Sequence, residues 1–259
     1  MSDLKQNEPP ESRRPGLVSS ALRSQSGYLV LVIVAVSVVA TILNPRFLSA
    51  RNIFNIMQQI SVLGILTTCM ALLMIAGNLD ISIGNLAGLV GIIFTRMVLA
   101  EHSMFLATIA VLVLAAVLGL INGLIISKSK TTPLIITLGM MYVFYGVALI
   151  ISQGRPLSLS GQFEFLGRAK IGPVPFTIVV YILVFVLGYL MLKYTTYGRR
   201  LNAIGGNKEA TFLSGINVDR HVISLSGLSG LVAGLAGLVL ASRVGMALAD
   251  NGHGYALQA

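Results

Sequence analysis

The 259 residues of this chain are too apolar for a soluble globular protein, because 55% are hydrophobic and only 10% are charged, against about 25% charged in soluble domains. The net charge of +9 arises from 18 Lys and Arg against 9 Asp and Glu, but the basic residues fall in short polar gaps between apolar runs, which argues against a nucleic-acid partner. The single cysteine, Cys69, excludes an internal disulfide and a multi-cysteine metal site. These features predict an all-α polytopic transmembrane helix bundle.

The first 26 residues are polar and include three prolines between positions 9 and 15. This composition is typical of disorder, and we expect residues 1–26 to form a disordered cytoplasmic tail ahead of a transmembrane domain over residues 27–259. The apolar run Gly27–Leu43 is long and lacks a small-residue cleavage pattern. It is therefore predicted to be a retained first span rather than a signal peptide.

The first span ends at Asn44-Pro45, because proline disfavours helix at the residue before it. The next stretch, Ser49–Gln59, is amphipathic and too polar to cross a bilayer, so we expect it to lie at the membrane interface. Six further apolar runs follow, none with the strict alternation of a barrel strand. They are Ile60–Ala76, Ile83–Leu99, Met104–Ser127, Leu134–Ile151, Val174–Leu192 and Val222–Ala241.

The distribution of basic residues predicts the orientation of the spans. If the basic N-terminal tail is cytoplasmic, the chain returns to the cytoplasm after every second span. Lys128, Lys130 and the basic gap 193–221 then lie in the cytoplasm, and the loop Ser152–Pro173 lies on the opposite side. The longest basic gap is thus cytoplasmic, as the positive-inside rule requires.

Glycine pairs four residues apart occur in three of the predicted helices. Such pairs let helices approach closely in lipid, and the 27 glycines indicate a tightly packed bundle with broken elements. This composition suits a transporter or channel better than a simple anchor. The pairs are Gly84 and Gly88, Gly119 and Gly123, and Gly230 and Gly234.

The segment 76–84 joins two apolar runs and contains Asp80, whose carboxylate is unfavourable between membrane helices unless it caps a helix, pairs or faces water. Two interpretations remain open: Asp80 or Ser82 caps the helix that follows, or the segment is a helix break on a solute pathway. The polar candidates are equally suited to hydrogen bonds between helices. Candidate pathway or helix-break residues are Gly77, Asn78, Asp80, Ser82, Gly84, Asn122 and Tyr142, and further ones are Gln58, Tyr145 and Gln153.

The basic gap 193–221 contains the pattern of a short helix. Asn207 is a favoured N-cap residue, and Glu209 falls in the first turn that would follow it. Gly215 is placed to end the helix, which predicts a helix over Lys208–Ser214. Because two isolated turns are unstable in water, we expect either a docking helix for a cytoplasmic partner or an ordinary loop.

Several motifs along the chain occur in an order typical of one family, although no single one would suffice. They are Asn44-Pro-Arg-Phe, Asn52-Ile-Phe-Asn-Ile, Gly77-Asn-Leu-Asp-Ile-Ser-Ile-Gly, Thr132-Pro-Leu-Ile-Ile-Thr-Leu-Gly-Met-Met, Tyr197-Gly-Arg-Arg, and Gly205-Gly-Asn-Lys-Glu-Ala-Thr-Phe-Leu-Ser-Gly-Ile-Asn-Val. With these motifs the chain, from about Gly27 to its last residue, resembles the permease subunits of ribose-type ABC sugar importers. In similar permeases the equivalent of residues 252–259 leads into further helices, so we expect this chain to lack their C-terminal helices.

The resemblance implies a permease subunit, in the cell inner membrane, that translocates a monosaccharide delivered by a periplasmic or extracellular binding protein. It implies a second permease copy, surrounding lipid, and a separate ATPase subunit that docks on the basic gap as a coupling loop. The coupling residues would be Asn207, Lys208, Glu209, Ala210, Phe212, Leu213 and Gly215.

The chain has no Gly-x-x-x-x-Gly-Lys-Ser/Thr motif, so we expect a transporter subunit and not an enzyme, with ATP used by the partner and no cofactor or metal of its own. The alternatives are an ATP-independent secondary transporter or channel for a small polar solute, and a membrane-embedded enzyme. Secondary transporters usually carry charges within their spans for ion coupling. Here the one charge within a predicted span is Arg96, near its end, with Glu101 as a candidate partner. The polar cluster Asp250, Asn251 and His253 has no companion acid at metal-ligand spacing, which argues against catalysis there.

Overall fold

The structure, a computed structural model, describes residues 25–129, 131–252 and 254–255. Most of the predicted N-terminal tail, residues 1–24, therefore lies outside the described residues, as do Lys130 and His253. Helix α2 (Gln25–Leu43) already includes the last two residues of that tail. The chain divides into two compact units, with the boundary after Ile53.

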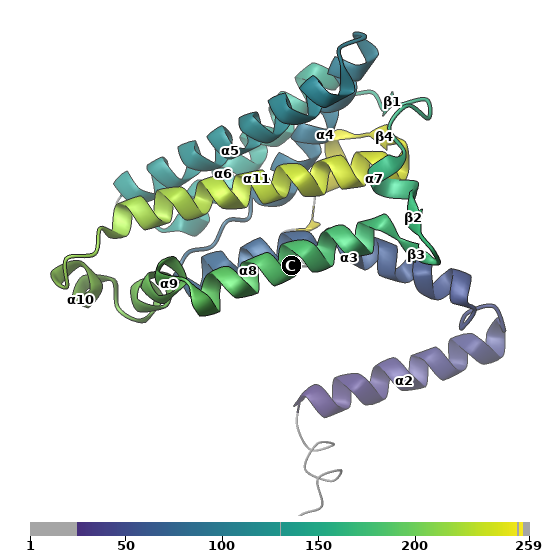
Figure 1. Cartoon of the computed structure of the whole chain (residues 1–259), viewed down its shortest axis with the longest axis horizontal. Helices are drawn as coiled ribbons and strands as arrows, with labels where there is room; N and C mark the ends of the chain where they lie inside the picture. The colour runs from purple at the N-terminus through teal and green to yellow at the C-terminus, as the bar shows by residue number, and fades with distance from the viewer. Residues whose placement is uncertain (1–24, 130, 253, 256–259) are drawn as a thin grey trace, which may run out of the picture. The chain divides into compact units, whose positions relative to one another are not determined.

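Each of the seven apolar runs predicted from the sequence lies largely in a helix (Figure 1), although residues 174 and 175 form a short strand and Ala76 follows the end of its helix. Five of these helices are long and apolar enough to cross a membrane, and the other two contain apolar segments of 17 residues. The prediction of a helical transmembrane bundle is therefore confirmed. The helices are α2, α3 (Ala50–Ile75), α4 (Ile83–Leu99), α5 (Met104–Lys128), α6 (Pro133–Ser152), α8 (Phe176–Tyr194) and α11 (Val218–Val244).

The remaining elements are short and lie in the connections. The helical ones are α7 (Phe165–Arg168), α9 (Thr196–Gly206), α10 (Lys208–Leu213) and the 3₁₀ turn η1 (Ala249–Gly252). Strand β1 (Leu157–Ser158) pairs antiparallel with β4 (Met246–Ala247), and β2 (Lys170–Ile171) pairs antiparallel with β3 (Val174–Pro175). These two-residue pairs fix loops against each other and do not form a sheet layer.

Helix α3 runs without interruption from Ala50 to Ile75, so nearly all of the amphipathic stretch Ser49–Gln59 is the first part of a long helix that continues into the apolar run, while its place at the membrane interface stays a prediction. The sequence between Ala50 and Leu63 contains neither proline nor glycine. Nothing therefore breaks the backbone hydrogen bonds where the polar first half meets the apolar second half. Amphipathic character at the start of α3 is a property of one end of a long helix.

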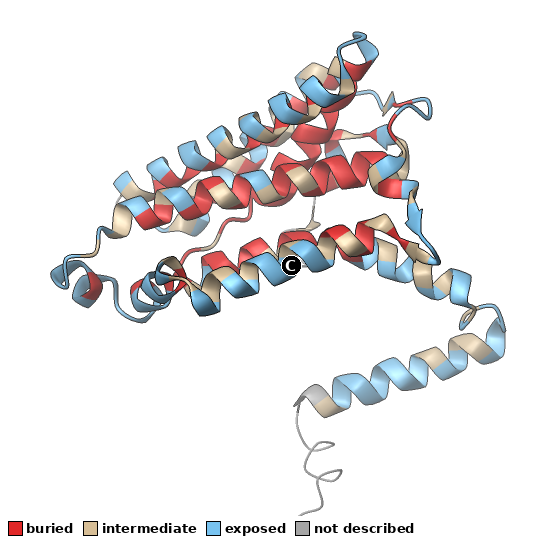
Figure 2. Cartoon of the chain, viewed as in Figure 1, coloured by how far each residue is buried: buried red, intermediate tan, exposed pale blue. Residues whose placement is uncertain are grey.

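Helix α4 forms the centre of the unit that starts at Phe54. Thirteen of its 17 residues are buried, and it packs against α5, α6, α11 and η1. Figure 2 shows much of α11 in red, whereas α5, α6 and α8 keep long exposed faces. An apolar exposed face is the expected surface of a helix that contacts lipid.

Small residues allow close approach of α5 and α11, the two helices with the most extensive mutual contact. A Cβ added at Gly119 would lie 2.9 Å from Gly230 Cα, and one added at Gly123 would lie 2.8 Å from Ile223 Cα. These distances are shorter than any contact a real Cβ makes, so only glycine permits this packing. The predicted role of these two glycine pairs is confirmed.

The connections of this unit gather at two opposite ends (Figure 1). At one end Lys128 of α5 forms an ion pair with Asp219 of α11, with 3.0 Å between Nζ and Oδ2. At the other end Gln58 donates a hydrogen bond to the Gly167 carbonyl, and the Arg96 side chain donates to the Ile151 carbonyl over 3.0 Å. Arg96 and Glu101 form no ion pair in the described part of the chain, so that predicted pairing is wrong.

Candidate functional site

Helix α10 lies in the basic gap and has the caps predicted from the sequence. The Asn207 side chain accepts a hydrogen bond from the Ala210 amide over 2.9 Å, which satisfies one of the free amides at the start of the helix. Gly215 ends the helix with a φ of 82°, a left-handed conformation that glycine adopts without strain. The observed span, Lys208–Leu213, is one residue shorter than predicted.

Two large apolar side chains of α10 are exposed. Phe212 has 67% and Leu213 has 78% of its surface accessible, while the neighbouring Thr211 is buried. Burying a phenylalanine or leucine side chain is worth about 1.5–3 kcal/mol, so leaving both in water is unfavourable. The pair therefore forms a small apolar surface next to the charged residue Glu209, as expected of a docking element.

Helix α9 attaches α10 to the end of helix α3. Leu201 of α9 packs in one apolar cluster with Leu72, Leu73 and Ala76. A Cβ added at Gly205 would overlap the carbonyl oxygen of Ile75, so glycine is required for this close approach. The start of the docking segment is thus packed against the last turn of α3.

Tyr197 attaches the same segment to α11. Its ring stacks on His221 with 5.4 Å between ring centroids, and its hydroxyl lies 2.8 Å from the Ser224 hydroxyl. Burial raises the pKa of Tyr197, so the hydroxyl stays protonated at neutral pH. Stacking and hydrogen bonding together hold α9 against the first turns of α11.

Lys208, the first residue of α10, extends to the loop between α3 and α4. Its Nζ lies 3.4 Å from the Gly77 carbonyl oxygen and 3.5 Å from the Asn78 side-chain oxygen, both at the long limit of a hydrogen bond. Gly77 has a φ of 69°, which favours glycine at this turn. Helix α10 therefore contacts the segment that leads into the central helix α4.

A buried polar cluster follows in that loop. Asp80 is 3% exposed, and its Oδ1 accepts the Ser82 amide over 2.9 Å and the Ser82 hydroxyl over 2.5 Å. The Asn122 side-chain amide of α5 donates to the Ser82 hydroxyl over 2.8 Å and lies 3.4 Å from Asp80 Oδ2. Asn122 is fully buried, and its Oδ1 has no hydrogen-bond partner among the residues that the structure describes. The cluster links the beginning of α4 to α5.

Ser82 precedes α4 but makes no side-chain capping bond to it. Asp80 instead accepts the amide of Ser82, which closes a turn just before the helix. Gly84, in the first turn of α4, packs against η1, because a Cβ at Gly252 would overlap the Gly84 carbonyl oxygen. The beginning of α4 is thus held on one side by Asn122 and on the other by η1.

The structure does not bring the remaining candidates into this cluster. Tyr142 is 64% exposed on α6. The Gln58 side chain bonds the Gly167 carbonyl at the opposite end of the unit, and Gln153 follows α6 in a left-handed conformation with a φ of 55°. Tyr145 lies on α6, partly buried and packed against the apolar core.

Three features of this site carry no clear signal in the sequence. Lys208 resembles any other basic residue of its gap, and Thr211 gives no indication that it is the buried residue of α10. The packing of Ala249–Gly252 on α4 was also not predicted, although the pair Gly84 and Gly88 indicated that some element approaches closely there. Each of these three features depends on which part of the chain, distant in sequence, packs against the residue.

Comparison with known proteins identifies the family. Residues 52–259 match the family described as the branched-chain amino acid transport system / permease component. This chain belongs to that permease family. No solved structure matches it.

Ribose permeases are among the relatives of this permease. The chain is 35% identical over 236 residues to the ribose import permease protein RbsC of Escherichia coli strain K12, which covers 89% of this chain and 73% of the relative. The ribose import permease protein RbsC of Bacillus subtilis strain 168 is 36% identical, with 90% and 72% covered. The L-arabinose ABC transporter permease protein AraH of Azospirillum brasilense is 31% identical, with 87% and 66% covered. The chain is accordingly similar to sugar ABC importer permeases, and its helices make it a multi-pass membrane protein.

Proposed function

We propose that this permease is the membrane-spanning subunit of an ABC importer for a monosaccharide, powered by a separate ATPase subunit. The relatives named for ribose and L-arabinose support the substrate class. Membership of the permease family favours this function over an ATP-independent secondary transporter or channel. In this proposal the chain binds no ATP, cofactor, metal or nucleic acid itself.

The observation that carries the proposal is the exposed apolar pair on α10. Phe212 and Leu213 enter a groove on the ATPase, and Glu209 lies at the rim of the contact. A buried central anchor contributes most of the affinity of such an interface, while a charge at its rim contributes little. The residues 193–221 then form the cytoplasmic coupling loop, and the N-terminus is cytoplasmic as well.

The contacts around α10 supply a route by which the ATPase acts on the permease. A displacement of α10 moves Lys208 and, through Gly205, the end of α3. The loop from Gly77 to Ser82 moves with them, and the hydrogen bonds of Asp80 and Asn122 carry the change to α4 and α5. Because α4 is the central helix, its displacement alters the packing of the whole bundle.

The binding protein would deliver its sugar at the opposite end of the bundle, where the loop 153–175 and strand β4 lie. A second permease copy would complete the pathway, because the grooves that one chain forms along α3, α8 and α11 are lined mainly by apolar side chains. The complex would lie in the inner membrane with lipid around its exposed apolar helix faces.

The test is a pull-down of the ATPase by the permease, with the complete set of subunits present. Phe212→Ala is expected to lower retention of the ATPase by roughly tenfold or more, because the lost burial of about 1.5–3 kcal/mol corresponds to at least one factor of ten in affinity. Glu209→Gln is the matched control and is expected to change retention less than fivefold. If Phe212→Ala and Leu213→Ala both retain the ATPase as the unchanged permease does, α10 is not the docking element.

A further inference from the structure

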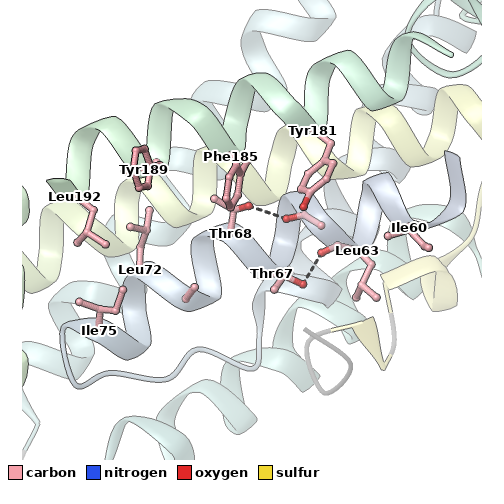
Figure 3. Close-up of a pocket in the computed structure, with 13 residues that line it drawn as sticks. Ile60, Leu63, Thr67, Thr68, Leu72, Ile75, Tyr181, Phe185, Tyr189 and Leu192 are labelled. Atoms are coloured by element: carbon pink, nitrogen blue, oxygen red, sulfur yellow. Dashed lines mark hydrogen bonds between the residues drawn. The ribbon is translucent and has the colours of Figure 1, made fainter. Parts of the chain in front are cut away.

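A long apolar groove lies between helices α3 and α8 (Figure 3). It has a volume of about 360 Å³ and is lined on α3 by residues such as Ile60, Leu63 and Ile75. On α8 the aromatic residues Tyr181, Phe185 and Tyr189 are four positions apart, so they form one stripe that faces α3. The helices touch at Gly64, where an added Cβ would lie 2.5 Å from the Tyr181 ring.

The groove offers almost no free hydrogen-bonding group. The Thr67 and Thr68 hydroxyls donate back to the carbonyls of their own helix, each over 2.8 Å, as the dashed lines in Figure 3 show. A sugar would lose its hydrogen bonds to water in such a groove and gain few in return. The groove therefore suits a hydrocarbon chain and not the transported solute.

The groove is longer than one leaflet of a bilayer core. From Ile60 to Ile75 the helix rises about 22 Å at 1.5 Å per residue. Half of a hydrocarbon core of about 30 Å is about 15 Å, so an acyl chain that enters from one surface fits within the groove. The occupied end would be the end where α3 terminates, next to α9.

That end of the groove is basic. The Lys193 ammonium donates to the Tyr189 hydroxyl over 2.6 Å and lies 5.1 Å from the Tyr189 ring centroid and 5.4 Å from that of Tyr194. Arg199 and Arg200 of α9 are exposed and come six and seven residues after Lys193 in the sequence. In the part of the chain that the structure describes, the ion pairs are Lys128–Asp219 and Arg168–Glu164, so none of these three cations is neutralised by an acid.

We propose that the groove is a binding site for an anionic phospholipid of the leaflet next to α9. One acyl chain lies along the aromatic stripe of α8, and the phosphate contacts Lys193, with Arg199 and Arg200 adding to the local positive potential. An apolar helix face of a second copy would leave the three cations at this end without a counter-charge, whereas the phosphate of an anionic lipid supplies one. The proposal does not depend on which solute the permease transports.

The experiment uses the absence of tryptophan from the chain. Phe185→Trp places a single fluorescent reporter in the groove, and the protein is reconstituted into phosphatidylcholine vesicles. Brominated phosphatidylglycerol or brominated phosphatidylcholine, at equal mole fraction, then quenches the reporter in proportion to its local occupancy. We expect about fivefold stronger association of the phosphatidylglycerol, the size of effect expected of one basic side chain near an anionic lipid.

Three variants locate the effect. Lys193→Gln in the reporter protein is expected to reduce the preference to about twofold or less, while Lys193→Arg keeps it. Lys128→Gln, which removes an exposed lysine that already pairs with Asp219, is expected to leave the preference unchanged. A preference that survives Lys193→Gln would overturn the assignment of this residue to the phosphate.

A second reporter separates the groove from the general lipid surface. Phe105→Trp on α5, at an exposed position outside the groove, is expected to be quenched equally by the two lipids. Equal quenching at Phe185→Trp would contradict the proposal. Weak quenching by both lipids at Phe185→Trp alone would show that protein, such as a second copy, covers the groove, and would contradict it as well.

Discussion

At the scale of single residues, Asp80 and Lys208 have different tasks. Asp80 is an acceptor inside the bundle, where it satisfies the amide and hydroxyl of Ser82. Lys208 lies on the exposed surface and contacts the same loop from outside through two long hydrogen bonds. Losing an acceptor in the interior leaves buried donors unsatisfied, whereas losing an exposed cation does not.

Replacing Asp80 with alanine should therefore destabilise the permease more than replacing it with asparagine. Asparagine keeps an oxygen for the Ser82 amide, and alanine leaves the amide and the hydroxyl without an acceptor, which costs about 1–3 kcal/mol for each buried group. The measurement is the thermal unfolding midpoint of the purified variants in mild detergent. Equal midpoints for Asp80→Asn and Asp80→Ala would show that these hydrogen bonds do not hold the loop.

Lys208→Ala should leave binding of the ATPase nearly unchanged but reduce the stimulation of ATP hydrolysis through the permease. The variant keeps Phe212 and Leu213, so we expect ATPase retention within about twofold of the unchanged permease. The contact with Gly77 and Asn78 is lost, so stimulation of ATP hydrolysis by the sugar-loaded binding protein should fall several-fold. Normal stimulation in Lys208→Ala, with stimulation also normal in the control Arg200→Ala, would exclude Lys208 as a coupling contact.

At the scale of elements, the contact between α5 and α11 depends on backbone proximity. Helices in lipid gain no hydrophobic advantage by associating, so close van der Waals packing at small residues holds them together. Gly119 and Gly230 face each other across this contact, and neither position has room for a side chain. By contrast, Gly139 on α6 has no atom within 4 Å of an added Cβ.

Gly119→Ala should accordingly destabilise the bundle, and Gly139→Ala should not. The added methyl group at Gly119 would overlap the Ser226 carbonyl oxygen, so α11 must move away, at a cost of about 1–3 kcal/mol. The thermal unfolding midpoint of each variant in the same detergent measures the difference. Similar midpoints for the two variants would contradict the packing of α5 on α11.

At the scale of the whole molecule, the connecting segments lie at two opposite ends of the helical unit, and their basic residues predict its orientation in the membrane. The segment 193–221 and the end of α3 meet at one end of the unit that starts at Phe54. The loop that contains Gly167 meets the last turn of α11, at Ser242, at the other end. The positive-inside rule predicts that the basic gap is cytoplasmic, and we therefore expect the Gly167 end to face outward.

Single cysteines test this orientation, because the native Cys69 is buried and reacts poorly. Ser214→Cys should react with a membrane-impermeant maleimide only in inside-out vesicles, and Gln162→Cys only in intact spheroplasts. Labelling of both positions from the same side of the membrane would refute the order of the spans. Labelling of each from the side opposite to that expected would invert the orientation.

The sequence by itself determined the helical membrane fold, the seven apolar runs, and the caps of α10 at Asn207 and Gly215. These properties depend on local composition and on hydrogen bonds within a few residues, so the order of residues is sufficient to specify them. The continuity of α3 also depends on local sequence. An amphipathic pattern, however, is the same for a short helix that ends at the membrane interface and for the first half of a longer helix.

Only the tertiary structure decided which distant residues meet. Asp80 and Asn122 were separate candidates in the sequence, and the approach of α5 to the beginning of α4 makes them one cluster. Lys208 became a contact of Gly77 because the close fit of Gly205 on Ile75 positions α9, which no local pattern specifies. The apolar groove likewise arises where α8 touches α3 at Gly64. The physical reason is that packing between helices depends on shape at both surfaces, whereas a sequence pattern describes one surface at a time.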